Sequence, residues 1–170
     1  MKAQRSLKGR ALQWLAQREQ SRSELRRKLM PHAVVEAEAV LQETGVELEL
    51  APAARVEAVL DWLEANNFLS HERFAESRVH ARASRFGNLR IRQELKQHQV
   101  ALSPEAAQAL KDTELQRARA VLQRKFAQAP ATPAERARQA RFLAGRGFSS
   151  EAISQALRRD GAEQHATFDG

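Results

Sequence analysis

Hydrophobic side chains along this chain recur mostly at intervals of three or four residues, the spacing that places them on one face of an α-helix. One such stripe lies within residues 6–19, and another follows Pro52 and ends at Asn66-Asn67. Ala and Leu together supply 50 of the 170 residues, whereas Val, Ile and Thr supply 15. Because Ala and Leu favour helices and the β-branched residues favour strands, we predict an all-α protein.

Polar residues that cap helices locate the ends of most segments. Ser21 and Glu24 have the spacing of a capping box, which predicts a helix from there to Met30, stopped by Pro31. Thr113 with Gln116 predicts a second box of this kind. The other helices are expected at about 34–43, 53–67, 70–85, 89–98, 104–111, 133–145 and 150–159.

These segments group into successive units of three helices. The apolar helix end, Gly or Asn turn, Phe and Ser cap of residues 62–70 return at 142–149. We therefore expect tandem three-helix repeats at 6–67, 70–111 and 113–160, with an acidic insertion at about 31–52 and a flexible tail at 161–170. Such units contact mainly their neighbours, which predicts an elongated, curved body. The residues expected at its turns and in its core are Trp62, Phe68, Phe74, Gly87 and Phe148.

Charge is distributed unevenly along the chain, whose net charge is +7. Residues 1–35 carry 9 basic and 2 acidic groups, whereas residues 36–64 carry 1 basic and 8 acidic groups. Arginine dominates the cations, at 22 against 6 Lys. Because the planar guanidinium binds two oxygens at once, such a surface suits phosphate or carboxylate partners. Helix faces kept soluble by charge remain the alternative.

The arginines form two candidate contact surfaces. In the helix at 70–85, Arg78, Arg82 and Arg85 lie on one face beside the apolar stripe. Arg90, Arg92 and Lys96 continue the positive charge on the next helix, and a second cluster contains Arg22 and Arg26. Some of these arginines could instead pair with Glu72, Glu76 or Glu94.

Catalytic and metal-binding patterns are absent from the sequence. The five His have no metal-binding spacing, there is no Cys, and no phosphate loop or nucleophile elbow occurs. We expect no enzymatic activity, no metal and no cofactor. Without Cys, and without an apolar stretch of the roughly 20 residues that cross a bilayer, we expect a cytoplasmic protein with no membrane contact.

Four short motifs, in this order, resemble the bacterial RecX regulatory proteins over about residues 6–160. They are Leu15-x-x-Arg18-Glu19-x-Ser21-Arg22-x-Glu24-Leu25-x-x-Lys28-Leu29, Phe68-Leu69-Ser70-x-x-Arg73-Phe74-Ala75, Arg82-x-x-Arg85-x-Gly87-x-x-Arg90-Ile91-Arg92-Gln93-Glu94-Leu95 and Phe142-Leu143-x-x-Arg146-Gly147-Phe148. Two departures are His98-Gln99-Val100, where the family has Lys-Gly-Ile, and Ser70-His71, where it often has two Asp.

The resemblance implies a monomeric, non-enzymatic modulator of the RecA recombinase. Members of the family lie in the groove of the RecA–DNA filament and reduce ATP hydrolysis, strand exchange and coprotease activity. The basic surfaces could also bind single- and double-stranded DNA. Which arginines contact RecA and which contact DNA stays open. The alternative is a helix-turn-helix DNA-binding regulator, which would also be small, basic and helical.

Overall fold

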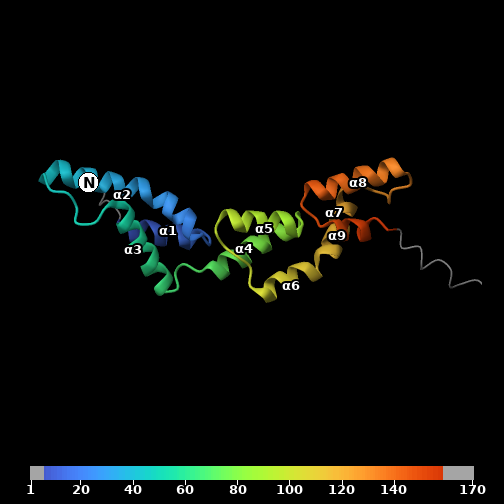
Figure 1. The fold of residues 1–170 in the computed structure, drawn as a ribbon, viewed down its shortest axis with the longest axis horizontal. Helices are drawn as coiled ribbons and strands as arrows, with labels where there is room; N and C mark the ends of the chain where they lie inside the picture. The colour runs from blue at the N-terminus through green and yellow to red at the C-terminus, as the bar shows by residue number, and fades with distance from the viewer. Residues whose placement is uncertain (1–5, 159–170) are drawn as a thin grey trace, which may run out of the picture. The chain divides into compact units, whose positions relative to one another are not determined.

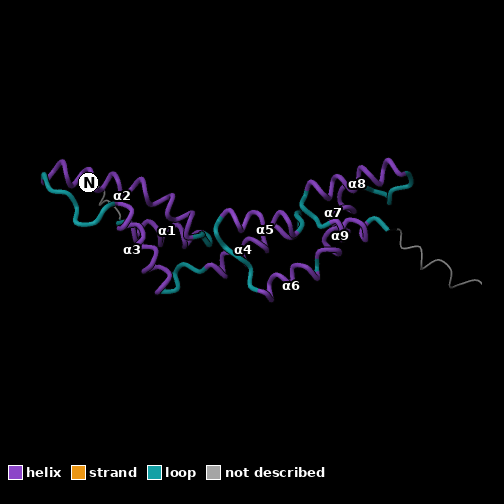
Figure 2. The backbone as a smooth tube through the Cα atoms, in the orientation of Figure 1, coloured by secondary structure: helices purple, strands orange, loops and turns teal. Residues whose placement is uncertain are grey.

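The computed structural model describes residues 6–158, which contain nine helices and no strand (Figures 1 and 2). In chain order they are α1 (Leu7–Gln17), α2 (Arg22–Thr44), α3 (Pro52–Ala65), α4 (His71–Ala83), α5 (Asn88–Gln97), α6 (Pro104–Asp112), α7 (Glu114–Lys125), α8 (Pro133–Gly145) and α9 (Ser150–Ala156). The all-α prediction is confirmed for this range. The tail expected at 161–170 lies outside it.

The helices divide into two compact units. The N-terminal unit comprises Met1–Ser77 and Leu95–Leu102, and the C-terminal unit comprises Arg78–Glu94 and Ser103–Gly170. The division runs through α4 and α5, so it does not follow the three successive units expected from the sequence. Those boundaries therefore stay a prediction.

The N-terminal unit has its core between α1, α2 and α3. Leu25 and Leu29 of α2 are fully buried against Leu60 and Leu63 of α3, and Ala11 of α1 completes the centre. The capping box expected at the start of α2 is present, with the Ser21 hydroxyl accepting from the Glu24 N–H and the Glu24 carboxylate accepting from the Ser21 N–H.

The prediction that Pro31 ends this helix is wrong, because α2 continues through Pro31 to Thr44. Proline removes one backbone hydrogen bond and strains the preceding turn, yet here it faces solvent. Packing on both sides of it holds the helix together: Leu29 and Ala33 are fully buried, and Arg55 of α3 pairs with Glu36 beyond the proline at 2.7 Å.

The C-terminal unit has its core between α7, α8 and α9. Its buried members are Ala118, Val121, Leu122, Leu143, Phe148 and Leu157. The capping box expected at Thr113 is wrong: Thr113 is helical, and its hydroxyl donates back to the carbonyl of Ala109 instead of accepting from a backbone N–H of the next turn. Hence α6 and α7 follow each other with only Thr113 between them.

Three helices, α3, α5 and α8, end in the same kind of turn. Asn67, Gln99 and Gly147 take positive φ values of 58°, 59° and 78°. The following N–H then donates to a buried leucine carbonyl five residues back, as Phe68 to Leu63, Val100 to Leu95 and Phe148 to Leu143. Residues 62–70 and 142–149 are therefore alike because both end a helix with this turn. Gln99 adopts the same turn, although the family has glycine there.

The aromatic residues after two of these turns differ in burial. Phe148 is 2% exposed, whereas Phe68 is 45% exposed, so the expectation of a core position is wrong for Phe68. Leu69 fills the core there, and Phe68 stacks on the half-buried Trp62 at 5.4 Å. The reason is one extra residue: Ser149 caps α9 directly after Phe148, whereas Leu69 separates Phe68 from the capping Ser70.

Candidate functional site: an arginine cluster around Phe86

Arg22 and Arg26 lie against acidic side chains of α3. Arg22 contacts Glu57, Asp61 and Glu64 at 2.6 to 2.7 Å, and Arg26 contacts Glu57 at 2.5 Å. Hydrogen bonds from Arg26 and then Arg22 lower the pKa of Glu57 to about 2. Burial disfavours the charge of Arg22, but these carboxylates still raise its pKa. Both arginines therefore join α2 to α3.

In the C-terminal unit, four arginines surround one aromatic ring. The guanidinium carbons of Arg82, Arg85, Arg90 and Arg146 lie 5.7, 5.7, 4.6 and 5.9 Å from the centre of the Phe86 ring. Guanidinium groups are attracted to the faces of aromatic rings, so Phe86 helps to hold all four arginines, although Arg146 lies closer to Phe142, at 4.7 Å. We call these four residues with Phe86 the arginine cluster.

Two glycines bring the parts of this cluster together. The Gly87 N–H donates to the Arg146 carbonyl at 2.9 Å, and the Leu89 N–H donates to the Gly147 carbonyl at 3.0 Å. A Cβ on Gly87 would lie 2.2 Å from the Phe148 backbone, and one on Gly147 would lie 2.6 Å from Arg90 Cβ. Only glycine allows these two segments to approach so closely.

A buried polar network supports the same turn. Arg117 of α7 donates to the carbonyls of Ala83, Phe86 and Leu110 and to the Asn88 side chain. Burial lowers the pKa of Arg117. Next to it, the buried Glu114 carboxylate accepts from the Asn88 N–H at 2.8 Å and from the Ser149 hydroxyl at 2.8 Å. Hydrogen bonds of Arg117 and Glu114 thus hold the turn that carries Phe86 in place.

The cluster has more positive charge than its neighbours neutralise. Glu94 contacts Arg82 at 2.9 Å and Arg90 at 3.6 Å. Arg85 and Arg146 have no carboxylate partner among the described residues, and Arg146 donates to the Arg85 carbonyl. Like charges held together repel one another, so an anion placed between them would be bound favourably.

The remaining predicted contact residues, Arg78, Arg92 and Lys96, are not members of the arginine cluster. Arg78 is half-buried and has contacts of its own, so the stripe expected from Arg78, Arg82 and Arg85 is only partly realised. Arg92 and Lys96 are exposed on α5 and have no ion pair in the described chain.

Sequence reasoning missed Phe86 as the anchor and Arg146 as a member of the cluster. Arg146 lies 61 positions after Arg85 in the chain, and helical periodicity relates only near neighbours. The feature of the sequence that could have pointed to them is the pair of glycines, Gly87 and Gly147, each of which follows a cluster residue in a turn.

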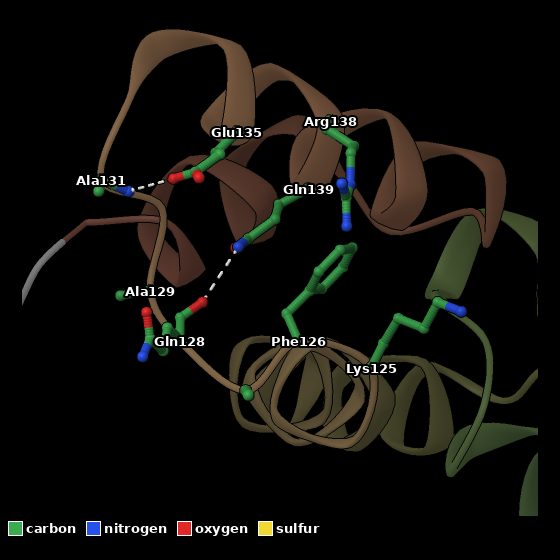
Figure 3. A pocket seen from close by; sticks show the side chains of 9 residues that line it. Lys125, Phe126, Gln128, Ala129, Ala131, Glu135, Arg138 and Gln139 are labelled. Carbon is green, nitrogen blue, oxygen red and sulfur yellow. Dashed lines mark hydrogen bonds between the residues drawn. The ribbon is translucent and has the colours of Figure 1, made fainter.

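Between the end of α7 and α8 the same unit has an open hollow of about 320 Å³ (Figure 3). Phe126 forms its floor, with the Arg138 guanidinium 5.3 Å from the ring centre, and Lys125 stands at the rim. Gln139 closes one side by donating to the Gln128 carbonyl, and Glu135 completes the capping box that Thr132 forms at the start of α8. The polar groups inside are largely engaged in holding the loop.

No group of metal-ligating side chains occurs among residues 6–158. None of the helices in that range is long and apolar enough to cross a membrane.

Comparison with known proteins places these residues in a family. Residues 70–103 match the model of the RecX second three-helix domain, and residues 112–157 match the RecX third three-helix domain. The regulatory protein RecX of Leptothrix cholodnii is 50% identical over 91% of this chain and 89% of its own. That of Ralstonia nicotianae is 49% identical over 89% of this chain and 86% of its own. The chain belongs to the RecX family.

The RecX fold is also found in a solved structure. The crystal structure of RecX from Lactobacillus salivarius matches with a TM-score of 0.58 and 15% identity, covering 89% of this chain and 92% of that one. Together with the family domains it confirms the three-helix repeat fold. The arginine cluster draws Arg82, Arg85, Phe86 and Arg90 from the second RecX domain and Arg146 from the third.

Proposed function

We propose that this chain is a non-enzymatic regulator that binds the filament formed by RecA on DNA and inhibits RecA ATP hydrolysis, strand exchange and coprotease activity. Membership of the RecX regulatory family supports the proposal. The structural observation that carries it is the arginine cluster, which holds four guanidinium groups around Phe86 against the single carboxylate of Glu94. A DNA-bound recombinase as partner also places the protein in the cytoplasm.

The surplus charge fits a filament. Acidic side chains of protein subunits and phosphates of DNA both present oxygens in pairs, which a guanidinium binds with two parallel hydrogen bonds. A filament also repeats its binding sites, so several weak contacts from one regulator can add up to useful affinity. We therefore assign the cluster to filament binding and leave Arg22 and Arg26 to the α2–α3 contact.

The test is inhibition of the single-strand-DNA-dependent ATPase of RecA, titrated at two ionic strengths. The cluster variant carries Arg85→Gln, Arg90→Gln and Arg146→Gln. The control variant carries Arg27→Gln, Lys111→Gln and Arg141→Gln, three exposed cations without an ion pair in the described chain, and has the same net charge. We expect the wild type and the control to inhibit alike, and the cluster variant to need about 3- to 100-fold more protein, since each contact is worth about 0.2–1 kcal/mol.

Salt should weaken the wild type more steeply than the cluster variant, because screening acts on the contacts that the variant lacks. Absence of inhibition by the wild type would contradict the proposed function and favour a helix-turn-helix regulator of DNA. Equal inhibition by the wild type and a folded cluster variant would show that another surface binds the filament.

A further inference from the structure

Exposed apolar side chains concentrate in one part of the N-terminal unit. Residues 34–50, the second half of α2 and the loop leading to α3, lie at one end of this unit (Figure 2). Five large apolar residues are exposed there: Val34, Val35, Leu41, Val46 and Leu50. Val46 is 65% exposed. Several large apolar side chains exposed within one short stretch of a helical unit mark a candidate interaction site.

The same stretch is uniformly acidic. It contains five Glu and no Lys or Arg. Glu36 pairs with Arg55, whereas Glu38, Glu43, Glu47 and Glu49 are exposed and have no ion pair in the described chain. We call residues 34–50 the acidic arm. Its chemistry calls for a partner surface that is both basic and apolar.

The C-terminal unit offers such a surface at residues 85–92, which we call the basic segment. It carries Arg85, Arg90 and Arg92 and no acidic residue. Leu89, in the same segment, is 59% exposed, and it is the one large apolar residue exposed in the described part of this unit. The arm and the segment thus combine exposed aliphatic groups with charge of opposite sign, which Glu94 offsets only at Arg90 of the segment.

We propose that the acidic arm of one copy of this chain docks on the basic segment of a second copy. Two arms repel each other, as do two segments, so the contact joins unlike surfaces. Each copy then keeps one free arm and one free segment, and the contact can repeat head to tail. A few exposed ion pairs and a small apolar area give a weak contact, so the dilute chain stays a monomer and associates as its concentration rises.

The proposal does not depend on RecA, and its test contains neither RecA nor DNA. Sedimentation velocity of the purified chain over a wide concentration range, at low and high salt, measures self-association directly. The arm variant carries Glu43→Lys and Glu47→Lys, and the segment variant carries Arg85→Glu and Arg92→Glu. All four positions are exposed, so we expect folded proteins. The control Glu76→Lys with Glu105→Lys makes the charge change of the arm variant at two exposed positions elsewhere.

We expect the wild type and the control to associate at low salt and to dissociate at high salt. Either variant alone should weaken association at least about tenfold, and the chain that carries all four substitutions should recover it, because the opposite charges are then exchanged. A wild type that stays monomeric at every concentration, an arm variant that associates like the wild type, or a four-fold variant that fails to recover would each overturn the proposal.

Discussion

At the scale of single residues, the arginine cluster depends on two glycines that let distant turns touch. Gly87 packs against the backbone of Phe148, and Gly147 packs against Arg90. A methyl group on either glycine would overlap these atoms. Through this contact Arg146 reaches the ring of Phe86. The cluster is therefore a tertiary feature, although each of its residues stands in a short local motif.

This dependence predicts that Gly87→Ala destabilises the protein by about 1–3 kcal/mol or more, because the added methyl group overpacks a site with backbone on its far side. Gly145→Ala is the matched control, since nothing lies within 4 Å of its added Cβ and alanine favours a helix. Urea unfolding of the two variants measures the difference. Equal stability of both would show that the two turns do not pack as described.

At the scale of helices, the ion pairs between α2 and α3 make stability depend on pH. The pKa of Glu57 lies at about 2, below its ordinary value of 4.5, because Arg26 and Arg22 bind the ionised form. Ionised Glu57 therefore stabilises the fold at neutral pH, and this contribution is lost as the pH falls from about 4.5 towards 2.

We expect Glu57→Gln to lower the urea midpoint at pH 7 and to flatten its fall between pH 4.5 and 2.5. Glu24, whose pKa is also lowered, keeps part of the acid sensitivity. Glu76→Gln removes an exposed carboxylate that has no ion pair in the described chain and should leave the profile unchanged. A Glu57→Gln profile that coincides with the wild type would contradict the assigned role of this contact.

Helix positions follow from the sequence wherever local chemistry decides them. Ser21, Ser103, Thr132 and Ser149 cap helices that begin where the sequence predicts a helix start, since a hydroxyl needs only the next turn as its partner. Pro31 does not end α2, because packing of α2 on α3 outweighs the local cost of a proline inside a helix. Thr113 misleads because its hydroxyl has carbonyls of the preceding helix within reach.

The candidate site was only partly predictable for a related reason. Arg82, Arg85 and Arg90 were expected from their spacing, and they lie together around Phe86. Spacing could not show that carboxylates of α3 hold Arg22 and Arg26, because Glu57 lies 35 positions from Arg22. Burial of Phe148 and exposure of Phe68 likewise depend on a single inserted residue, Leu69.

At the scale of the whole molecule, the chain separates its charges by segment. Residues 36–64 have a net charge of −7 although the protein is net +7. The structure uses part of the acidic charge internally, through Glu36, Glu57, Asp61 and Glu64. The remaining carboxylates of the acidic arm and the surplus arginines of the cluster stay available for partners.

If the arginine cluster binds the RecA filament, as we propose, the affinity of the chain for preformed filaments must depend on it. Preformed filaments of RecA on single-stranded DNA, held by a slowly hydrolysed ATP analogue, are titrated into the labelled chain while its fluorescence anisotropy is followed. We predict saturable binding by the wild type and by the Arg27, Lys111 and Arg141 control, and binding about 3- to 100-fold weaker for the folded cluster variant. Binding of equal strength by all three, or no binding by the wild type, would contradict the claim.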